Sequence, residues 1–274
     1  MRIDAHQHFW KFDPVRDSWI TEDMGVIKRD FLPGDLEPML QDTGIGGTIS
    51  VQASQSTTET DFLLRLARNH DFIKGVVGWV DLKDEGVIDQ LEFYKRNPKF
   101  KGVRHILQAE SKGFMTDTKF IWGLRRLYSQ DLTYDILIYE KQLEEVCDLV
   151  RLLPEMRLVI DHIGKPNIKD SSFDQWAKYM KELSQYPHVY AKLSGMITEA
   201  DWNNWTEDDL QPYVDFMLTH FGADRLMYGS DWPVCKVAGS YMEVHSAMLA
   251  CISELSFGDQ EKIMGMTAAK FYKL

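Results

Sequence analysis

The sequence contains little cysteine and no long apolar run. Its three cysteines, Cys147, Cys235 and Cys251, lie far apart without a CxxC pair, so neither a disulfide framework nor a thiolate zinc site is indicated. No stretch approaches the roughly 20 apolar residues that a membrane-spanning helix needs, and the residues after Met1 contain no apolar signal core. We therefore expect a cytoplasmic protein that has no membrane partner.

Positive charge is also scarce. The chain carries 31 Lys and Arg against 42 Asp and Glu, a formal net charge of -11, which disfavours nucleic-acid binding through a broad basic surface. Neither GxGxxG nor GxxxxGK[ST] follows any expected strand, which weakens a dinucleotide or nucleotide-binding interpretation. A small molecule is the expected partner, and a homo-oligomer remains open.

What the sequence does contain is an alternation of strand-like and helix-like segments. With 274 residues and 44% hydrophobic residues, it has the length and core of one barrel domain over residues 1–274. Eight β-rich apolar runs are separated by amphipathic segments, which predicts an α/β (β/α)₈ TIM-like barrel, although an open doubly wound sheet gives a similar alternation. The runs are Ile3 to His8, Thr48 to Ala53, Gly75 to Leu82, Gly102 to Leu107, Tyr134 to Tyr139, Leu158 to His162, Val189 to Leu193 and Leu226 to Asp231. The segment from Lys11 to Gly47 is interpreted as an elaborated loop followed by a helix, placed where loops form an active-site mouth.

The first run ends with two histidines. His6 and His8 are two residues apart, so strand geometry points both imidazoles to one face, and Asp4 is expected on that face one step deeper. Two nitrogen donors would then converge. An isolated HxH pattern is weak evidence for converging ligands. The alternative is that one histidine packs in the core and the other lies at the surface.

The sixth run ends in Asp161-His162, and the chain then breaks at Gly164 and Pro166. An imidazole at the carboxyl end of a barrel strand is where catalytic groups are normally mounted, and Lys165 is close enough to reach the same mouth. A core histidine bound to a backbone carbonyl is the alternative.

The eighth run ends in Asp231, before Trp232 and Pro233. In a closed barrel the eighth strand lies beside the first, which would bring Asp231 next to His6 and His8. This carboxylate could bind a divalent metal, accept a proton from water, or do both in turn. The alternative is an ordinary turn or helix N-cap aspartate.

Further residues could contact a substrate. Arg104 and His105 are adjacent on the fourth run and should point to opposite faces, so at most one readily enters the barrel. Arg104 could bind a substrate carbonyl or carboxylate, or lock neighbouring strands through a salt bridge. Trp10, Trp79 and Trp232 could form flat apolar walls against a sugar ring, or could be core residues.

Taken together, four motifs resemble the amidohydrolase-related family that includes sugar-acid lactonases, and the resemblance spans nearly the whole chain. The motifs are Asp4-Ala5-His6-Gln7-His8-Phe9-Trp10, Gly102-Val103-Arg104-His105, Asp161-His162-Ile163-Gly164-Lys165-Pro166 and Gly229-Ser230-Asp231-Trp232-Pro233. The resemblance implies a distorted (β/α)₈ barrel, hydrolysis of a lactone ester, and catalytic or metal-binding roles for His6, His8, His162 and Asp231. The superfamily often has a bridging lysine on a middle strand, and the run from Tyr134 to Glu140 offers none, so a two-metal site is not expected.

The resulting hypothesis is a lactonase that opens a sugar-acid lactone. Asp231 would take the proton from water and His162 would assist, while Arg104 or Lys165 would stabilise the developing oxyanion. His6, His8 and Asp231 would hold one divalent ion, zinc or manganese, although a metal-independent site remains open. The alternatives are a metal-dependent non-oxidative decarboxylase and a barrel that binds a sugar acid without turnover.

Overall fold

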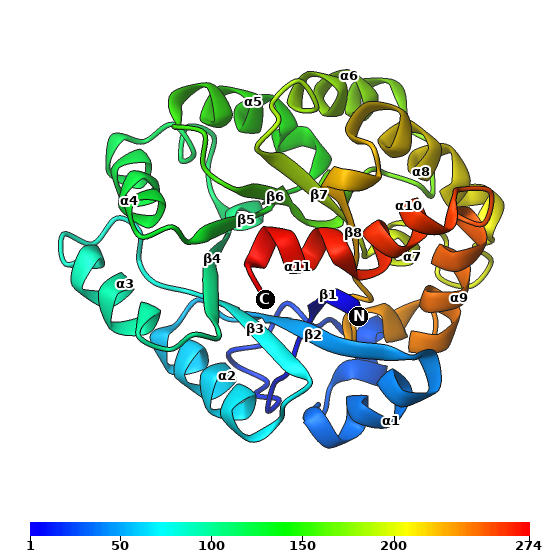
Figure 1. The fold of residues 1–274 in the computed structure, drawn as a ribbon, viewed down its shortest axis with the longest axis horizontal. Helices are drawn as coiled ribbons and strands as arrows, with labels where there is room; N and C mark the ends of the chain where they lie inside the picture. The colour runs from blue at the N-terminus through cyan, green and yellow to red at the C-terminus, as the bar shows by residue number, and fades with distance from the viewer.

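The computed structural model describes residues 1–274, with eight parallel strands around a central axis and helices outside them (Figure 1). The strands follow one another around the sheet in chain order, each paired with the next, as a strand-helix alternation requires. Their bounds are β1 (Arg2–Gln7), β2 (Ile45–Val51), β3 (Ile73–Gly78), β4 (Phe100–Ile106), β5 (Thr133–Leu137), β6 (Leu158–Ile160), β7 (Val189–Leu193) and β8 (Leu226–Tyr228). The predicted strands are all present, with ends that differ by a few residues.

The sheet closes between β8 and β1. A parallel bridge joins Gln7 to Trp232, just beyond the end of β8. The backbone N–H of His8 donates to the Trp232 carbonyl at 2.7 Å, and the N–H of Asp231 donates to the His6 carbonyl at 2.8 Å. The prediction of a (β/α)₈ barrel is confirmed. Its seam joins the motif that contains His6 and His8 to the motif that contains Asp231.

The helices form the outer layer. They are α1 (Pro33–Thr43), α2 (Thr57–Asn69), α3 (Val87–Lys95), α4 (Thr118–Ser129), α5 (Leu143–Leu152), α6 (Asp174–Leu183), α7 (Met196–Glu199), α8 (Glu207–Phe221), α9 (Tyr241–Cys251), α10 (Phe257–Glu261) and α11 (Thr267–Tyr272). Local sequence fixes several helix starts: Ser56 accepts the N–H of Glu59 before α2, and Asp117 caps α4. None of the helices combines the length and apolar character that a membrane span requires.

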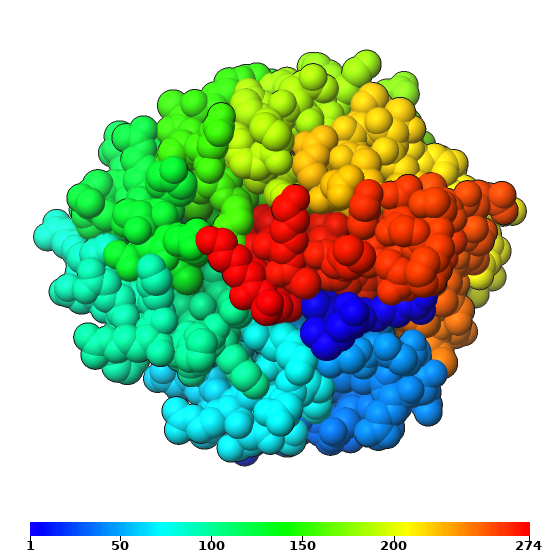
Figure 2. All heavy atoms as spheres, in the orientation of Figure 1, coloured from blue at the N-terminus to red at the C-terminus, as the bar shows by residue number.

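The C-terminal segment covers one end of the barrel. In Figures 1 and 2, α11 lies across the centre of this face, beside the N-terminus. Phe271 and Tyr272 pack against Ile3 and other apolar side chains of the barrel interior. Lys101, at the start of β4, donates to the Lys273 carbonyl at 3.0 Å, which identifies this face as the amino end of the strands. The carboxyl ends, where barrel enzymes mount their chemistry, lie at the opposite face.

Candidate active site

The two histidines at the end of β1 point to the same place. The Nε2 atoms of His6 and His8 are 3.2 Å apart, and both side chains are buried. Asp4 does not share their face, so that expectation was wrong: its carboxylate accepts the N–H and the hydroxyl of Ser230 at 2.9 and 2.6 Å. The reason is an irregularity in the β1–β2 register between Asp4 and Gln7, which breaks the strict alternation of a strand.

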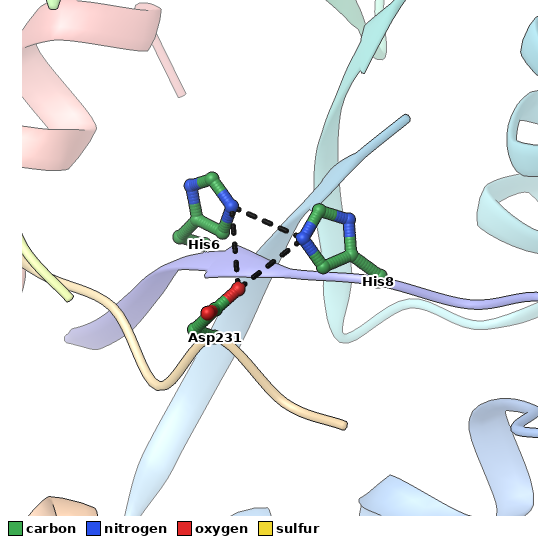
Figure 3. A group of neighbouring side chains, drawn as sticks. All are labelled: His6, His8 and Asp231. Carbon is green, nitrogen blue, oxygen red and sulfur yellow. Dashed lines mark hydrogen bonds and ion pairs between the residues drawn. The ribbon is translucent and has the colours of Figure 1, made fainter. Parts of the chain in front are cut away.

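Asp231 completes a three-residue cluster with the histidines (Figure 3). Its Oδ1 atom lies 3.3 Å from Nε2 of His8 and 3.7 Å from Nε2 of His6. Its backbone is left-handed, with a φ of 55°, a conformation that costs a non-glycine residue on the order of 1–3 kcal/mol and often occurs at functional sites. Burial would raise the pKa of the Asp231 carboxyl, but His162, His8 and Lys165 outweigh it and lower that pKa. The carboxylate is therefore ionised at neutral pH.

The protonation of the histidines leaves lone pairs directed into the cluster. Nδ1 of His8 is 2.7 Å from the Val51 carbonyl, which can only accept, so this nitrogen carries the proton and Nε2 is free. Burial lowers the pKa of His6 well below its usual value, although Asp161 opposes the shift. Nδ1 of His6 lies 3.3 Å from Asp161 Oδ1 and 3.2 Å from the Lys192 ammonium, and the tautomer protonated on Nδ1 presents the Nε2 lone pair to the cluster. A carboxylate behind a ligating histidine is a common arrangement around metals.

These three residues fit a single divalent ion. Zinc–nitrogen distances of about 2.0–2.1 Å in tetrahedral geometry place neighbouring ligands about 3.3 Å apart, and the three donor atoms are separated by 3.2, 3.3 and 3.7 Å. Two neutral imidazoles and one carboxylate are also a donor set that such ions accept. The cluster can therefore hold a divalent metal ion.

His162 lies beside this cluster, directly after β6. Its Nε2 is 4.0 Å from Asp231 Oδ1, and its Nδ1 is 2.9 Å from the Ser194 hydroxyl. Burial lowers the pKa of His162 well below its usual value, so the imidazole is neutral. Its backbone is also left-handed, and Gly195 allows the close approach of the turn after β7, because a Cβ at that position would lie 2.5 Å from Nδ1 of His162.

Arg104 enters the barrel from β4, whereas His105 faces outward and pairs with Glu110 at 2.8 Å. The guanidinium of Arg104 lies 3.0 Å from Asp161 Oδ2 and 3.3 Å from Nε2 of His6. Only 3% of the Arg104 surface is exposed, but the side chain reaches the cavity above the cluster. Sequence analysis offered two roles for Arg104, a salt bridge between neighbouring strands or contact with a substrate. Its position allows both, because it pairs with Asp161 and also lines the cavity.

Beneath the cluster lies a buried charge network that sequence analysis missed. Lys192 of β7 has its Nζ 2.6 Å from Asp135 Oδ2, 2.9 Å from Asp161 Oδ1 and 3.2 Å from His6 Nδ1. Burial raises the pKa of Asp135 to about 6 despite Lys192, and the Tyr272 hydroxyl donates to this carboxyl at 2.8 Å. Asp161 has the opposite shift: burial raises its pKa, but Lys192, His6 and Arg104 together hold it well below the usual value. The sequence signal that could have indicated this network is a charged residue within an otherwise apolar strand, Asp135 in β5 and Lys192 in β7.

A cavity of about 420 Å³ opens above the cluster at the carboxyl ends of the strands. Of the predicted residues, His8, Trp10, Arg104, His162, Lys165 and Asp231 line it. Sequence analysis did not anticipate Trp19, Tyr139, Glu199 and Trp202, which also line it. These four lie in loops and short helices, where no strand periodicity indicates a direction.

Two predicted substrate-wall residues lie elsewhere. Trp232 is 1% exposed and packs edge-on against Phe9 and Phe31, so it belongs to the core. Trp79 is also outside the cavity lining, and its indole N–H points to Nδ1 of His105 at 3.4 Å, on the outer side of β4. The sequence placed both next to the motifs, but the backbone after each strand directs these indoles away from the cavity.

Comparison with known proteins shows the family of the chain. The amidohydrolase family model matches residues 3–274. L-fucono-1,5-lactonases of Burkholderia multivorans and Burkholderia ambifaria are 39% and 36% identical to the chain, over all of it and 96% of each relative. A crystal structure of a Burkholderia multivorans amidohydrolase with bound zinc superposes with a TM-score of 0.97 at 39% identity, covering 100% of this chain and 99% of that one. The chain belongs to the amidohydrolase family.

Proposed function

We propose that this protein hydrolyses the ester bond of a sugar-acid lactone, with L-fucono-1,5-lactone as the first substrate to test. The observation that carries the proposal is the cluster of His6, His8 and Asp231 at the base of a cavity, in a chain similar over its whole length to two L-fucono-1,5-lactonases. Lactone opening needs an activated water and stabilisation of the carbonyl oxygen as it becomes negative, and the site offers groups for both.

Asp231 is the proposed general base. The ionised carboxylate takes a proton from the attacking water as the water oxygen bonds to the lactone carbonyl carbon. His162, 4.0 Å from that carboxylate and neutral, orients the water and assists the proton transfer. The guanidinium of Arg104, which lines the cavity, donates to the carbonyl oxygen as negative charge develops. The ring C–O bond then breaks, the ring oxygen receives the proton, and the open-chain hydroxy acid leaves.

A divalent ion held by His6, His8 and Asp231, zinc or manganese, would supply Lewis-acid polarisation of the carbonyl and lower the pKa of a bound water. We propose at most one such ion per chain. A second set of donors exists in His6, Asp161 and His162. However, Lys192 and Arg104 both pair with Asp161, and their positive charges would repel a second cation there.

Charge in the cavity favours lactone hydrolysis over decarboxylation. A decarboxylase must hold the carboxylate of its substrate, which requires a cation available for pairing. The two cations that line the cavity are already paired within the protein, Arg104 with Asp161 at 3.0 Å and Lys165 with Glu199 at 2.8 Å. An uncharged lactone fits this cavity better than an aromatic acid.

A proton-release assay tests the proposal directly. Purified protein, with and without added zinc or manganese, is incubated with L-fucono-1,5-lactone, other aldonolactones and aromatic carboxylic acids at neutral pH, and acid production and carbon dioxide are followed. We expect acid release from at least one aldonolactone above the spontaneous rate and no carbon dioxide. Carbon dioxide without lactone opening would refute the proposal, and so would full inactivity toward every lactone in all metal conditions.

A further inference from the structure

Lys165 and Glu199 form an ion pair in the wall of the cavity. Lys165 Nζ donates to Glu199 Oε1 at 2.8 Å, and both side chains line the cavity. The two residues come from different units of the barrel, Lys165 from the turn after β6 and Glu199 from the end of α7. The Lys169 N–H donates to the Glu199 carbonyl at 3.0 Å, which ties the two segments together and fixes the separation of the pair.

Both partners keep hydrogen-bonding capacity after pairing. An ammonium has three donors and a carboxylate has two acceptor oxygens, and the pair uses one donor and Oε1. The side chains are only 18% and 21% exposed and both line the cavity, so these remaining groups are available to a molecule bound there. Burial would lower the pKa of Lys165, but Glu199 outweighs it and raises that pKa, so the lysine stays charged.

An adjacent donor and acceptor match the hydroxyls of a sugar ring. Of two neighbouring hydroxyls, one can donate to a carboxylate oxygen while the other accepts from an ammonium. The indole of Trp202 lines the same cavity, and its N–H donates to the Thr198 carbonyl at 2.9 Å, so the ring is held in place as a flat apolar surface for sugar C–H groups.

The pair also sets the charge that a substrate meets. Lys165 alone would attract a carboxylate, but Glu199 neutralises it, and Asp231 adds a further negative charge on the same lining. A lactone that carries its own carboxylate would face Glu199 or Asp231 without an unpaired cation to compensate.

We propose that Lys165 and Glu199 bind two neighbouring ring hydroxyls of the substrate and thereby select uncharged, polyhydroxylated lactones over carboxylated ones. This inference rests on the proposed lactonase function and adds the substrate class. Both residues touch the substrate away from the bond that breaks, so they act on binding and selectivity, and the water-activating groups are separate from them.

The test compares three lactones that differ in these features. L-Fucono-1,5-lactone carries hydroxyls without a carboxylate, δ-valerolactone has the six-membered ring without hydroxyls, and D-glucaro-1,4-lactone carries both hydroxyls and a carboxylate. In Glu199→Gln we expect kcat/KM for L-fucono-1,5-lactone to fall about 10- to 100-fold, mainly through KM, as is typical for loss of a hydrogen bond to a charged group. Activity on δ-valerolactone should stay unchanged, and kcat/KM for D-glucaro-1,4-lactone should rise, because Lys165 is no longer neutralised.

A second variant and a matched control keep the result interpretable. Lys165→Met should also lower kcat/KM for L-fucono-1,5-lactone but should not gain activity on D-glucaro-1,4-lactone. Glu261→Gln removes a carboxylate with the same 2.8 Å pairing distance, to Arg2 at the amino end of β1, and should leave all three activities unchanged. Thermal melts verify that each variant is folded.

The outcomes separate the two proposals. If the parent hydrolyses none of the aldonolactones, the lactonase function itself fails. If the parent is active but Glu199→Gln and Lys165→Met change activity on L-fucono-1,5-lactone and δ-valerolactone by the same factor, hydroxyl binding by the pair is refuted. Unaltered preference between the neutral and carboxylated lactones in Glu199→Gln would overturn the charge selection.

Discussion

Replacing Lys192 with methionine removes the cation that lies between two buried carboxylates beneath the site. Lys192, Asp135 and Asp161 have no exposed surface, and the ammonium lies 2.6 and 2.9 Å from the two carboxylates. Methionine nearly conserves the length of the side chain, so the main change is the loss of charge and of the hydrogen bonds it makes. We predict that Lys192→Met destabilises the protein severely.

The expected loss of stability depends on which partners Asp161 and Asp135 keep once Lys192 is replaced. Asp161 keeps Arg104 at 3.0 Å, whereas Asp135 keeps only the Tyr272 hydroxyl at 2.8 Å. The variant therefore leaves Asp135 without a cation, and breaking a buried pair in this way costs about 3–5 kcal/mol. Domains of ordinary stability unfold with about 5–15 kcal/mol, so the loss is a large fraction of the total. Substituting Asp135 by Asn in the same chain removes the uncompensated charge and should restore about 1–3 kcal/mol.

Urea unfolding at pH 7, followed by tryptophan fluorescence and circular dichroism, measures the free energy of unfolding of each protein. The set contains the parent, Lys192→Met, Asp135→Asn and the double variant, with Lys262→Met as a control for a partly exposed lysine that pairs with Asp224 and Asp259. The control should unfold like the parent. A loss below about 1 kcal/mol in Lys192→Met, or a double variant no more stable than the single one, would refute the view that this lysine compensates buried charge.

Three further predictions concern the reaction, the metal and pH. Asp231→Asn removes the proton acceptor at nearly constant volume, and lactone turnover should fall about 10²–10⁴-fold while the thermal midpoint changes little; undiminished turnover in the folded variant would remove Asp231 from the mechanism. Elemental analysis should find no more than one equivalent of zinc or manganese per chain, and His6→Ala should weaken zinc binding measured by competition with a chromophoric chelator; two equivalents would contradict a single site. Because burial raises the pKa of Asp135 to about 6, the folded protein holds a proton that the unfolded chain releases, so this group stabilises the fold at low pH and its contribution is lost as the pH rises through about 4 to 6. Neutral, buried His6 and His162 act in the opposite direction. The Asp135 contribution is therefore measured as the difference in free energy of unfolding between the parent and Asp135→Asn at each pH. This difference should change between about pH 4 and 6, and pH profiles that stay parallel would contradict the prediction.

The sequence was sufficient for the parts of the molecule where periodicity and chain order decide the geometry. Eight apolar runs predicted eight strands, and barrel closure predicted that Asp231 would lie beside His6 and His8. The opposite directions of Arg104 and His105 also follow from strand alternation. In each case a simple geometric rule connects residue spacing to position.

Where local backbone departs from these rules, the predictions were wrong or absent. The irregular register of β1 turned Asp4 toward Ser230, although alternation placed it with the histidines. The turns after the strands directed Trp79 and Trp232 away from the cavity and brought Glu199 and Trp202 into it. Side-chain direction in such turns depends on tertiary packing, which a single sequence does not report.

The floor and the mouth of this site have different physical constraints. Asp135, Asp161 and Lys192 are fully buried and charged, and none of them lines the cavity. Loss of Lys192 leaves Asp135 without a cation, and loss of Asp161 leaves Arg104 without its carboxylate. Lys165 and Glu199 are partly exposed and line the cavity. They lie on segments outside the strands, which make none of the hydrogen bonds between barrel strands. Substitutions in the mouth can therefore alter which lactone is accepted at little cost in stability, whereas substitutions in the floor lower stability before they can alter selectivity. If the two proposals hold, changes in the turns after β6 and β7 alter the substrate range and leave the proposed water-activating cluster intact.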